Sequence, residues 1–277
     1  MGGKVDRRAI WRRTTLAIGL LTAAPGASAL ELEFATMHFP PYVELQEGMA
    51  QGPLVRLLLG ACGQLRWQCR IQVLPWRRAT AQIERGEADG AFPLLETVAR
   101  RQTFHLSLQV VDIQYAFFSR AGQSFDYQEG QRLGRRQVGV FGPSGTATVL
   151  QALVGTQPTT VVVEPDNGVV LRKLLALRYG EDGLAFVNRD VAWQLAYEQG
   201  LTGLREAGVA QSAAYVFGLS RRRVGEADFR AFDQALAQLC RSGAAATLLA
   251  PRLIPSAVCA GGHKAAAPRD EPKGVLR

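Results

Sequence analysis

The chain of 277 residues is 47% hydrophobic and 20% charged, and it carries a formal net charge of +8. This length and composition predict a compact fold of one or two domains, and short apolar runs that alternate with helical segments indicate the α/β class. The basic residues are scattered in short runs, such as Arg77-Arg78 and Arg135-Arg136. Because a nucleic-acid surface requires Lys and Arg clustered with aromatic residues on one face, we expect no nucleic-acid binding.

The first 29 residues have the pattern of a secretory signal peptide. Lys4 and four arginines precede an apolar run from Leu16 to Ala24, and the small residues Ala27-Ser28-Ala29 form a cleavage site. The run is shorter than the roughly 20 residues of a membrane span, so we expect cleavage instead of an N-terminal anchor. Cleavage would remove five basic residues and one acid and lower the formal charge from +8 to +4. Since no later apolar run is long enough either, we expect a soluble, exported protein.

The segment from residue 30 to residue 100 alternates predicted strands and helices. After Asp89, the small and apolar run 90–95 has the composition of a strand that is covered on both faces. Ligands of open α/β sheets bind beyond the carboxyl ends of the strands, so this strand would bring Arg100 to a crevice. The first strand would bring His38-Phe39-Pro40-Pro41-Tyr42 to the same edge. The predicted elements are, in order, strand 32–36, helix 53–61, strand 71–74, helix 77–85 and strand 90–95.

The segment 110–119 is predicted to be extended, and it is the place where a two-lobed protein would pass from one lobe to the other. Beyond it, strand 137–141 leads through Gly142-Pro143-Ser144-Gly145-Thr146 into an apolar helix. Free backbone N–H groups and the positive end of the helix dipole make such a turn a favourable anion site. The alternative is that Ser144 is a simple N-cap of a helix that binds nothing. A phosphate-binding P-loop is excluded, because no Gly-Lys-Ser/Thr follows the glycines.

The remaining segments predict further strands and helices and a second crossing segment. The strand 184–187 ends in Asn188-Arg189-Asp190. Helix 226–240 has Phe229, Phe232, Leu236 and Leu239 on one face, which predicts that it packs on a core. Residues 260–277 are rich in Gly, Ala, Pro and charge, so we expect a disordered tail. The other predicted elements are strand 160–164, helix 169–179, the second crossing at 209–215, strand 216–219 and a short helix after Ser242-Gly243.

Two of these stretches carry a family resemblance. The segment from Trp76 to Arg100 contains an aromatic residue, a helix that ends at Gly86, the aspartate Asp89 before a buried strand, and Thr97-x-x-Arg100. The earlier stretch MHFPPYVELQEGMAQGPL adds Pro-Pro-Tyr and a glycine-marked turn into a helix. In this order and separation, they resemble the periplasmic substrate-binding proteins of polar amino-acid ABC transporters, solute-binding protein family 3. The resemblance covers roughly residues 31 to 250.

The resemblance implies a two-lobed α/β fold of the type II periplasmic-binding-protein class. Each lobe would be a mostly parallel sheet flanked by helices, and two hinge crossings would join the lobes. Lobe 1 would consist of residues 30–118 and 212–259, and lobe 2 of residues 119–211. We therefore expect a periplasmic location.

The resemblance also assigns ligand-binding positions. Phe39 and Trp76 would hold an apolar part of the ligand between two rings, although both are also suited to an ordinary core. Arg100 from lobe 1 and the turn Gly145-Thr146 from lobe 2 would hold a carboxylate between them. Asn188 falls where the family has a carboxylate for the ligand's ammonium group, and Asp190 follows two residues later. The sequence leaves open which of these two would meet the ammonium group.

Other positions depart from the family pattern and bear on the choice of ligand. The strand before Thr97 carries Phe92-Pro93-Leu94-Leu95 in place of small hydroxyl or glycine residues, and Ala99 replaces a common glutamate. Thr36 stands where members that bind basic ligands have a carboxylate. We therefore expect a neutral or aromatic amino acid, or another carboxylate, and not lysine or arginine.

The four cysteines agree with export to an oxidising compartment. Cys62 and Cys69 flank a predicted helix-to-strand turn where a short bridge can close, and some family members carry a disulfide at this place. The alternative is two unpaired thiols. Cys240 and Cys259 could pair across the C-terminal helix and its tail. Four cysteines allow three pairings, so the sequence leaves this second bridge open. A zinc site is disfavoured, because the three histidines, His38, His105 and His263, are far from any cysteine pair in the sequence.

The sequence thus predicts a monomeric binding protein that closes on a small carboxylate-bearing ligand, with an amino acid as the first choice. Its partner would be an inner-membrane ABC permease, with no cofactor, metal or catalytic residue. One alternative is an enzyme on the same scaffold, similar to cyclohexadienyl or arogenate dehydratases, with an acid among Glu96, Glu164 and Asp190. Another is a sensor or accessory protein without a transport role. The sequence distinguishes neither the ligand nor a transport component from a sensor.

Overall fold

The computed structural model describes residues 1–2, 30–249 and 259. Nearly all of the predicted leader, 1–29, and the whole predicted tail, 260–277, lie outside these residues. The strands are β1 (Glu31–Thr36), β2 (Glu44–Gln46), β3 (Met49–Gln51), β4 (Gln68–Val73), β5 (Gly90–Leu95), β6 (Phe104–Leu106), β7 (Val111–Arg120), β8 (Gln137–Phe141), β9 (Thr160–Glu164), β10 (Leu184–Asn188) and β11 (Leu204–Ser220). The helices are α1 (Pro53–Gln64), α2 (Trp76–Glu84), α3 (Val98–Thr103), α4 (Gly145–Val154), α5 (Asn167–Leu175), α6 (Arg189–Glu198), α7 (Glu226–Arg241) and α8 (Ala244–Leu249).

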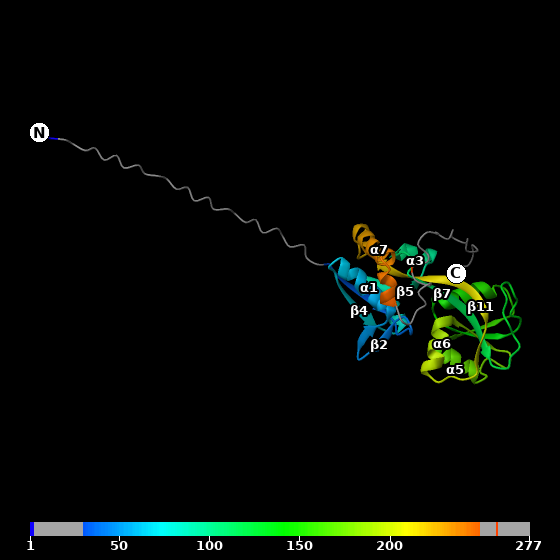
Figure 1. Ribbon diagram of the computed structural model, residues 1–277. Helices are drawn as coiled ribbons and strands as arrows, with labels where there is room; N and C mark the ends of the chain where they lie inside the picture. The colour runs from blue at the N-terminus through cyan, green and yellow to red at the C-terminus, as the bar shows by residue number, and fades with distance from the viewer. Residues whose placement is uncertain (3–29, 250–258, 260–277) are drawn as a thin grey trace.

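The described residues form two lobes that share one sheet (Figure 1). Its strand order is β4-β1-β5-β11-β7-β10-β8-β9, and β6 pairs with β11 outside this path. We call lobe 1 the part built on β4, β1 and β5, and lobe 2 the part built on β10, β8 and β9. Strands are parallel within each of these groups. The architecture agrees with the predicted two-lobed α/β fold.

In lobe 1, helices cover both faces of the parallel strands. Phe34 and Phe92 belong to the large core that includes residues of α1 and α7, whereas Ala35 and Ala91 pack in a smaller cluster with α2. The alternation is the one expected for neighbouring side chains on a strand. Gly90 allows this close packing, since a Cβ atom there would lie 2.4 Å from the ring of Phe34.

Lobe 2 repeats the arrangement with α4, α5 and α6. The parallel strands β8 and β10 are buried over most of their length, which explains their continuous apolar runs. Tyr179 packs over β8 at Gly139, where a Cβ atom would come within 2.3 Å of the tyrosine ring. This contact accounts for one correction to the sequence prediction: the helix expected over 169–179 ends at Leu175, because the chain turns at Leu177 (φ 61°) and carries Tyr179 into the core.

The two lobes are joined by the long strands β7 and β11. They pair antiparallel from Leu204↔Arg120 to Tyr215↔Val111, and the far end of β11 continues beside β5. In Figure 1 both strands run from one lobe into the other. They contain the crossings predicted at 110–119 and 209–215, and these crossings lie side by side.

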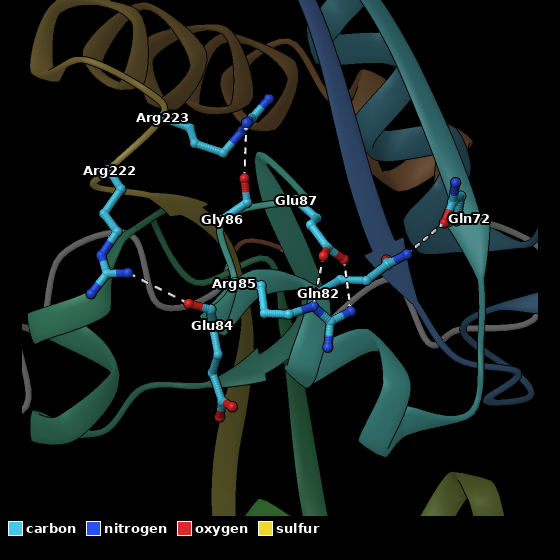
Figure 2. Close-up of polar contacts among 8 residues, drawn as sticks. All are labelled: Gln72, Gln82, Glu84, Arg85, Gly86, Glu87, Arg222 and Arg223. Atoms are coloured by element: carbon cyan, nitrogen blue, oxygen red, sulfur yellow. Dashed lines mark hydrogen bonds and ion pairs between the residues drawn. The ribbon is translucent and has the colours of Figure 1, made fainter.

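The turn between α2 and β5 is tied to the chain that follows β11 (Figure 2). Gly86 adopts φ +71°, and its carbonyl oxygen accepts a 2.9 Å hydrogen bond from Nη1 of Arg223. Nε of Arg223 also lies 2.6 Å from Oδ1 of the buried residue Asp89. The second oxygen of Asp89 accepts from the backbone N–H of Glu33 at 2.7 Å. Asp89 is therefore a structural residue that joins β1, β5 and the segment after β11.

Two disulfides occur among the described residues. Cys62 is bonded to Cys69, with a Cα–Cα distance of 6.2 Å, and Cys240 is bonded to Cys259, with a distance of 5.8 Å. The first joins α1 to β4, as expected from the sequence. The second joins the end of α7 to residue 259, whose backbone N–H donates to the carbonyl of Val110 beside β7.

Several short elements were absent from the sequence prediction. The hairpin of β2 and β3, the helix α3, the strand β6 and the helix α6 are each ten residues or shorter. Their apolar patterns are too short to show a period. Two of them nevertheless begin at residues that are typical N-caps, namely Thr97 before α3 and Asn188 before α6.

Candidate ligand-binding site

A pocket of about 40 Å³ lies between the two lobes. This volume exceeds the ~10–15 Å³ needed for one water, but it is small compared with most ligand pockets. The pocket is therefore a narrow space. Its lining comes from both lobes and from the long strands that connect them. The lining residues are Met37, Phe39, Trp76, Pro93, Leu95, Arg100, Tyr115, Phe141, Ser144, Gly145, Thr146 and Tyr215.

Among the described residues of this lining, Arg100 is the one that carries a formal charge. It lies on α3, where the hydroxyl of Thr97 caps the helix by accepting from the N–H of Arg100 at 3.2 Å. Its Nη1 donates to the carbonyl oxygen of Leu95 at 2.8 Å. Among the described residues, no carboxylate lies within ion-pair distance of Arg100. Burial lowers the pKa of its guanidinium, partly opposed by Tyr115 and Tyr215, but an arginine remains protonated at neutral pH.

The N-terminus of α4, in lobe 2, lines the same pocket. The hydroxyl of Ser144 accepts from the N–H of Ala147 at 3.2 Å and donates to the carbonyl of Phe141 at 2.6 Å. The next two residues, Gly145 and Thr146, line the pocket and belong to the first turn, whose N–H groups have no partner within the helix. Ser144 is therefore the N-cap of α4, as the alternative to an anion site supposed. The same helix end also lines the pocket that Arg100 lines.

The lobes are in contact at this point. A Cβ atom on Gly145 would lie 2.7 Å from Cδ1 of Leu95, which belongs to β5 of lobe 1. Any larger side chain at position 145 would push against Leu95. The absence of a side chain at Gly145 thus permits the close approach of α4 to the strand that leads to Arg100.

Aromatic side chains form the apolar wall. Phe39 stacks on Tyr42, with ring centroids 5.6 Å apart, and meets the edge of Tyr215 at 6.0 Å. Trp76, at the start of α2, also lines the pocket. Phe39 and Trp76, predicted from the sequence to lie beside the ligand, thus reach the same pocket as Arg100 and Gly145-Thr146.

Three tyrosines form a polar layer at and behind the pocket. Nδ2 of Asn188 donates to the hydroxyl of Tyr215 at 3.1 Å. The hydroxyl of Tyr115 interacts with the side chains of Thr146 and Tyr215, and burial raises its pKa more than these contacts lower it. Burial likewise raises the pKa of Tyr42 and of Tyr215, so all three hydroxyls are protonated at neutral pH.

Asn188 and Asp190, the positions assigned to a ligand's ammonium group, do not line the pocket. Asn188 is 2% exposed, and its Oδ1 caps α6 by accepting from the N–H groups of Asp190 and Val191 at 2.9 and 3.2 Å. Oδ2 of Asp190 accepts from the hydroxyl of Tyr42 at 2.8 Å. Both residues therefore contact the tyrosine layer in this structure and hold it in place.

Some lining residues escaped the sequence prediction. Tyr115 and Tyr215 lie on the long strands β7 and β11. In such a segment the sequence does not distinguish an aromatic residue that packs in a core from one that lines a pocket. Met37 directly follows the predicted strand 32–36, and Phe141 is the last residue of the predicted strand 137–141. Ligands of open α/β sheets bind beyond the carboxyl ends of the strands, so the position of these two residues at strand ends could have indicated that they line the pocket.

No family model matches the chain, and no curated protein is similar to it in sequence. Solved structures match it well in shape. The amino-acid ABC transporter substrate-binding protein AbpA of Streptococcus pneumoniae, bound to L-arginine, aligns with a TM-score of 0.67 at 19% identity, covering 82% of this chain and 96% of that one. A histidine kinase sensor domain with similarity to periplasmic binding proteins aligns with a TM-score of 0.67 at 17% identity, covering 80% and 94%.

The chain has the periplasmic-binding-protein fold. A third neighbour shows how broadly this fold is used: an ancestral amino-acid-binding protein, AncCDT-1, described as a precursor of cyclohexadienyl dehydratase, aligns with a TM-score of 0.65 at 13% identity, covering 79% of this chain and 92% of that one. Besides AbpA, the structural neighbours include another substrate-binding protein of an amino acid ABC transporter and an arginine-, lysine-, histidine-binding protein, ArtJ. Such identities establish the periplasmic-binding-protein fold and not the ligand.

Neither a membrane span nor a metal cluster is found in the part of the chain that the structure describes. There, no helix combines the length and apolar composition needed to cross a bilayer. Among the same residues, no three His, Cys, Asp or Glu side chains are grouped so as to hold a metal ion. The described residues that line the pocket contribute a guanidinium, backbone N–H groups, hydroxyls and apolar walls.

Proposed function

We propose that this protein binds a small carboxylate-bearing ligand between its lobes, in the class to which amino acids belong. The observation that carries the proposal is that Arg100 and the N-terminus of α4 line one pocket. A guanidinium holds a carboxylate through two parallel hydrogen bonds, and a helix N-terminus presents N–H groups to the same anion. Each group belongs to a different lobe, so an anion between them favours the closed state.

The cellular role proposed for this binding is uptake. A leader at 1–29 would export the chain to the periplasm, where the protein would act as a monomer and deliver its ligand to an inner-membrane ABC permease. The proposed lobes are residues 30–118 with 212–259, and residues 119–211. Support comes from the fold and from the amino-acid ABC transporter proteins among its structural neighbours.

The dehydratase-like alternative receives no support from the pocket. A dehydratase of that kind needs a carboxyl acid at the ligand, and no Asp or Glu is among the described residues that line the pocket. Of the three acids considered from the sequence, Glu96 pairs with Arg101 at 2.5 Å, and Glu164 accepts from Lys173 at 2.7 and 2.8 Å. Asp190 bonds to Tyr42. The second candidate function is that of a sensor domain, which would bind the same ligand in the same pocket without a role in transport.

The test compares two neighbouring arginines. Arg100→Gln removes the charge from the pocket, whereas Arg101→Gln removes a charge that is 60% exposed and paired with Glu96 outside the pocket. Charge-assisted hydrogen bonds contribute on the order of 1.5–3 kcal/mol each, so losing two of them corresponds to at least about 100-fold weaker binding. We expect this loss in calorimetric titrations of Arg100→Gln, with a melting temperature of the free protein close to wild type. Unchanged affinity together with a large loss of stability would make Arg100 a structural residue and overturn the proposal.

A further inference from the structure

The polar groups that face the pocket are mainly hydrogen-bond donors. Arg100 contributes a guanidinium, which has donors and no acceptor. The first turn of α4 contributes the N–H groups of Gly145 and Thr146. The hydroxyls of Tyr115 and Tyr215 are protonated at neutral pH; they interact with each other, and that of Tyr115 also interacts with the side chain of Thr146.

Four backbone carbonyl oxygens of lining residues already accept hydrogen bonds within the protein. The carbonyl oxygen of Leu95 accepts from Arg100 at 2.8 Å, and that of Phe141 accepts from Ser144 at 2.6 Å. The carbonyl oxygen of Phe39 accepts from the N–H of Val43 at 3.0 Å, and that of Tyr215 accepts from the N–H of Val110 at 2.9 Å. No carboxylate lines the pocket within the described part of the chain.

The two polar side chains closest behind the tyrosines are engaged in the same way. Oδ1 of Asn188 accepts from two N–H groups of α6, and its Nδ2 donates to Tyr215. One oxygen of the Asp190 carboxylate, Oδ2, accepts from the hydroxyl of Tyr42 at 2.8 Å. Neither side chain is among those that line the pocket.

We propose that the ligand is a monocarboxylate with an apolar or aromatic body and without an α-ammonium group. This inference rests on the proposed function and narrows its ligand class. A carboxylate matches a set of donors, whereas an ammonium group brought into the same pocket finds no carboxylate among the described lining residues and lies near the cationic Arg100. An unpaired buried charge is strongly unfavourable, and like charges at close range add to that penalty. The remaining lining is apolar: Met37, Phe39, Trp76, Pro93, Leu95 and Phe141.

The experiment uses pairs of ligands that differ only in the ammonium group. The pairs are propionate with L-alanine, 4-methylpentanoate with L-leucine, and 3-phenylpropionate with L-phenylalanine, and each acid is also compared with its neutral amide. Calorimetric titration of the purified wild-type protein gives a dissociation constant for each compound. We expect at least one acid to bind tenfold or more tightly than both its amino-acid partner and its amide.

The outcomes separate this inference from the proposed function. If the amino acid of every binding pair is bound as tightly as the acid or more tightly, the exclusion of the ammonium group is wrong, while carboxylate binding stands. If an amide equals its acid, the charge is not recognised, and both proposals fail. If no compound of any pair binds, both fail as well. Arg100→Gln should abolish the preference for acid over amide, whereas Arg101→Gln should preserve it.

Discussion

The hydroxyl of Tyr42 donates a 2.8 Å hydrogen bond to Oδ2 of Asp190 and thereby connects the two lobes. Tyr42 follows β1 in lobe 1, and Asp190 lies in the first turn of α6 in lobe 2. Burial and the negative charge of Asp190 both raise the pKa of Tyr42 well above its ordinary value, so its hydroxyl remains a donor. This bond stabilises the state in which the lobes touch.

Tyr42→Phe is expected to weaken ligand binding by about tenfold. The change removes a hydrogen bond to a charged group, for which we take roughly 1.5 kcal/mol, and 1.4 kcal/mol corresponds to a factor of ten. Because the bond is present only when the lobes meet, its loss favours the open state. Calorimetry should report the lower affinity, and small-angle X-ray scattering should report a larger radius of gyration without ligand. Tyr197→Phe, at an 86% exposed position, is the matched control and should change neither value.

Gly145→Ala should reduce affinity without destabilising the free protein. The new methyl group would come within 2.7 Å of Leu95 Cδ1 and hold α4 away from β5, whereas alanine is favourable in a helix. We expect roughly a tenfold loss of affinity in the same titration. The double variant Gly145→Ala with Leu95→Ala removes the clash. It should bind more tightly than expected from adding the two single effects. Simple additivity would show that contact between the lobes at this point does not control closure.

The stability of the protein should decrease on mild acidification because of His105. Its Nδ1 lies 3.1 Å from Glu226, and its ring stacks on Phe229 at 4.9 Å. Burial, and then the charge of Arg221, lower its pKa, and these effects outweigh Glu226. The folded pKa is thus below the unfolded one, so the unfolded state binds more protons and the free energy of unfolding falls as the pH drops below about 6.5.

Urea unfolding at about pH 7.5 and 5.5 measures this effect. Wild type should lose more stability between these values than His105→Gln, whose side chain does not titrate. A wild type that gains stability relative to the variant on acidification would show that attraction between protonated His105 and Glu226 dominates, and would reverse the assigned sign.

The double change Cys62→Ser with Cys69→Ser should lower stability and leave ligand binding intact. The bridge closes a short loop, with a sequence separation of 7, for which the chain-entropy model gives about 2–3 kcal/mol. Neither cysteine lines the pocket. Thermal unfolding should show the loss, and calorimetry should show an unchanged affinity. Mass mapping of unreduced peptides should find the bridge in the wild-type protein and place its first residue near Leu30.

The comparison of sequence with structure shows which signals carry information about a site. Arg100 and Gly145-Thr146 were predicted to share one site, because an arginine beyond a buried strand and a glycine turn before a helix each have a specific chemical use. They line one pocket, and their contact with a ligand stays a prediction. The α/β class was predictable from alternating apolar runs, whereas the two lobes were predicted from the family resemblance. Tyr115 and Tyr215 were not, since their strands pass from core to pocket without any change in composition.

Asn188 shows a different kind of limit. An asparagine after a buried strand can face a ligand or cap the next helix, and the sequence alone suits both roles. Here α6 begins directly after it, and the amide oxygen binds two of the helix's first N–H groups. The helix was missed in the sequence, so the capping role that it requires was missed as well.

The pairing of β7 with β11 has a mechanical consequence. Two separate linkers would let the lobes rotate about several axes, but strands that are hydrogen-bonded to each other along the junction must bend and twist together. Motion between the lobes is thereby reduced to the flexing of a single ribbon. Its most compliant points are the register shifts between Glu206 and Gly208 and between Val209 and Gln211, where ladder bonds are interrupted. The stiffness of this ribbon sets how much elastic energy a bound anion must overcome, so substitutions at the shifts should change affinity from outside the pocket.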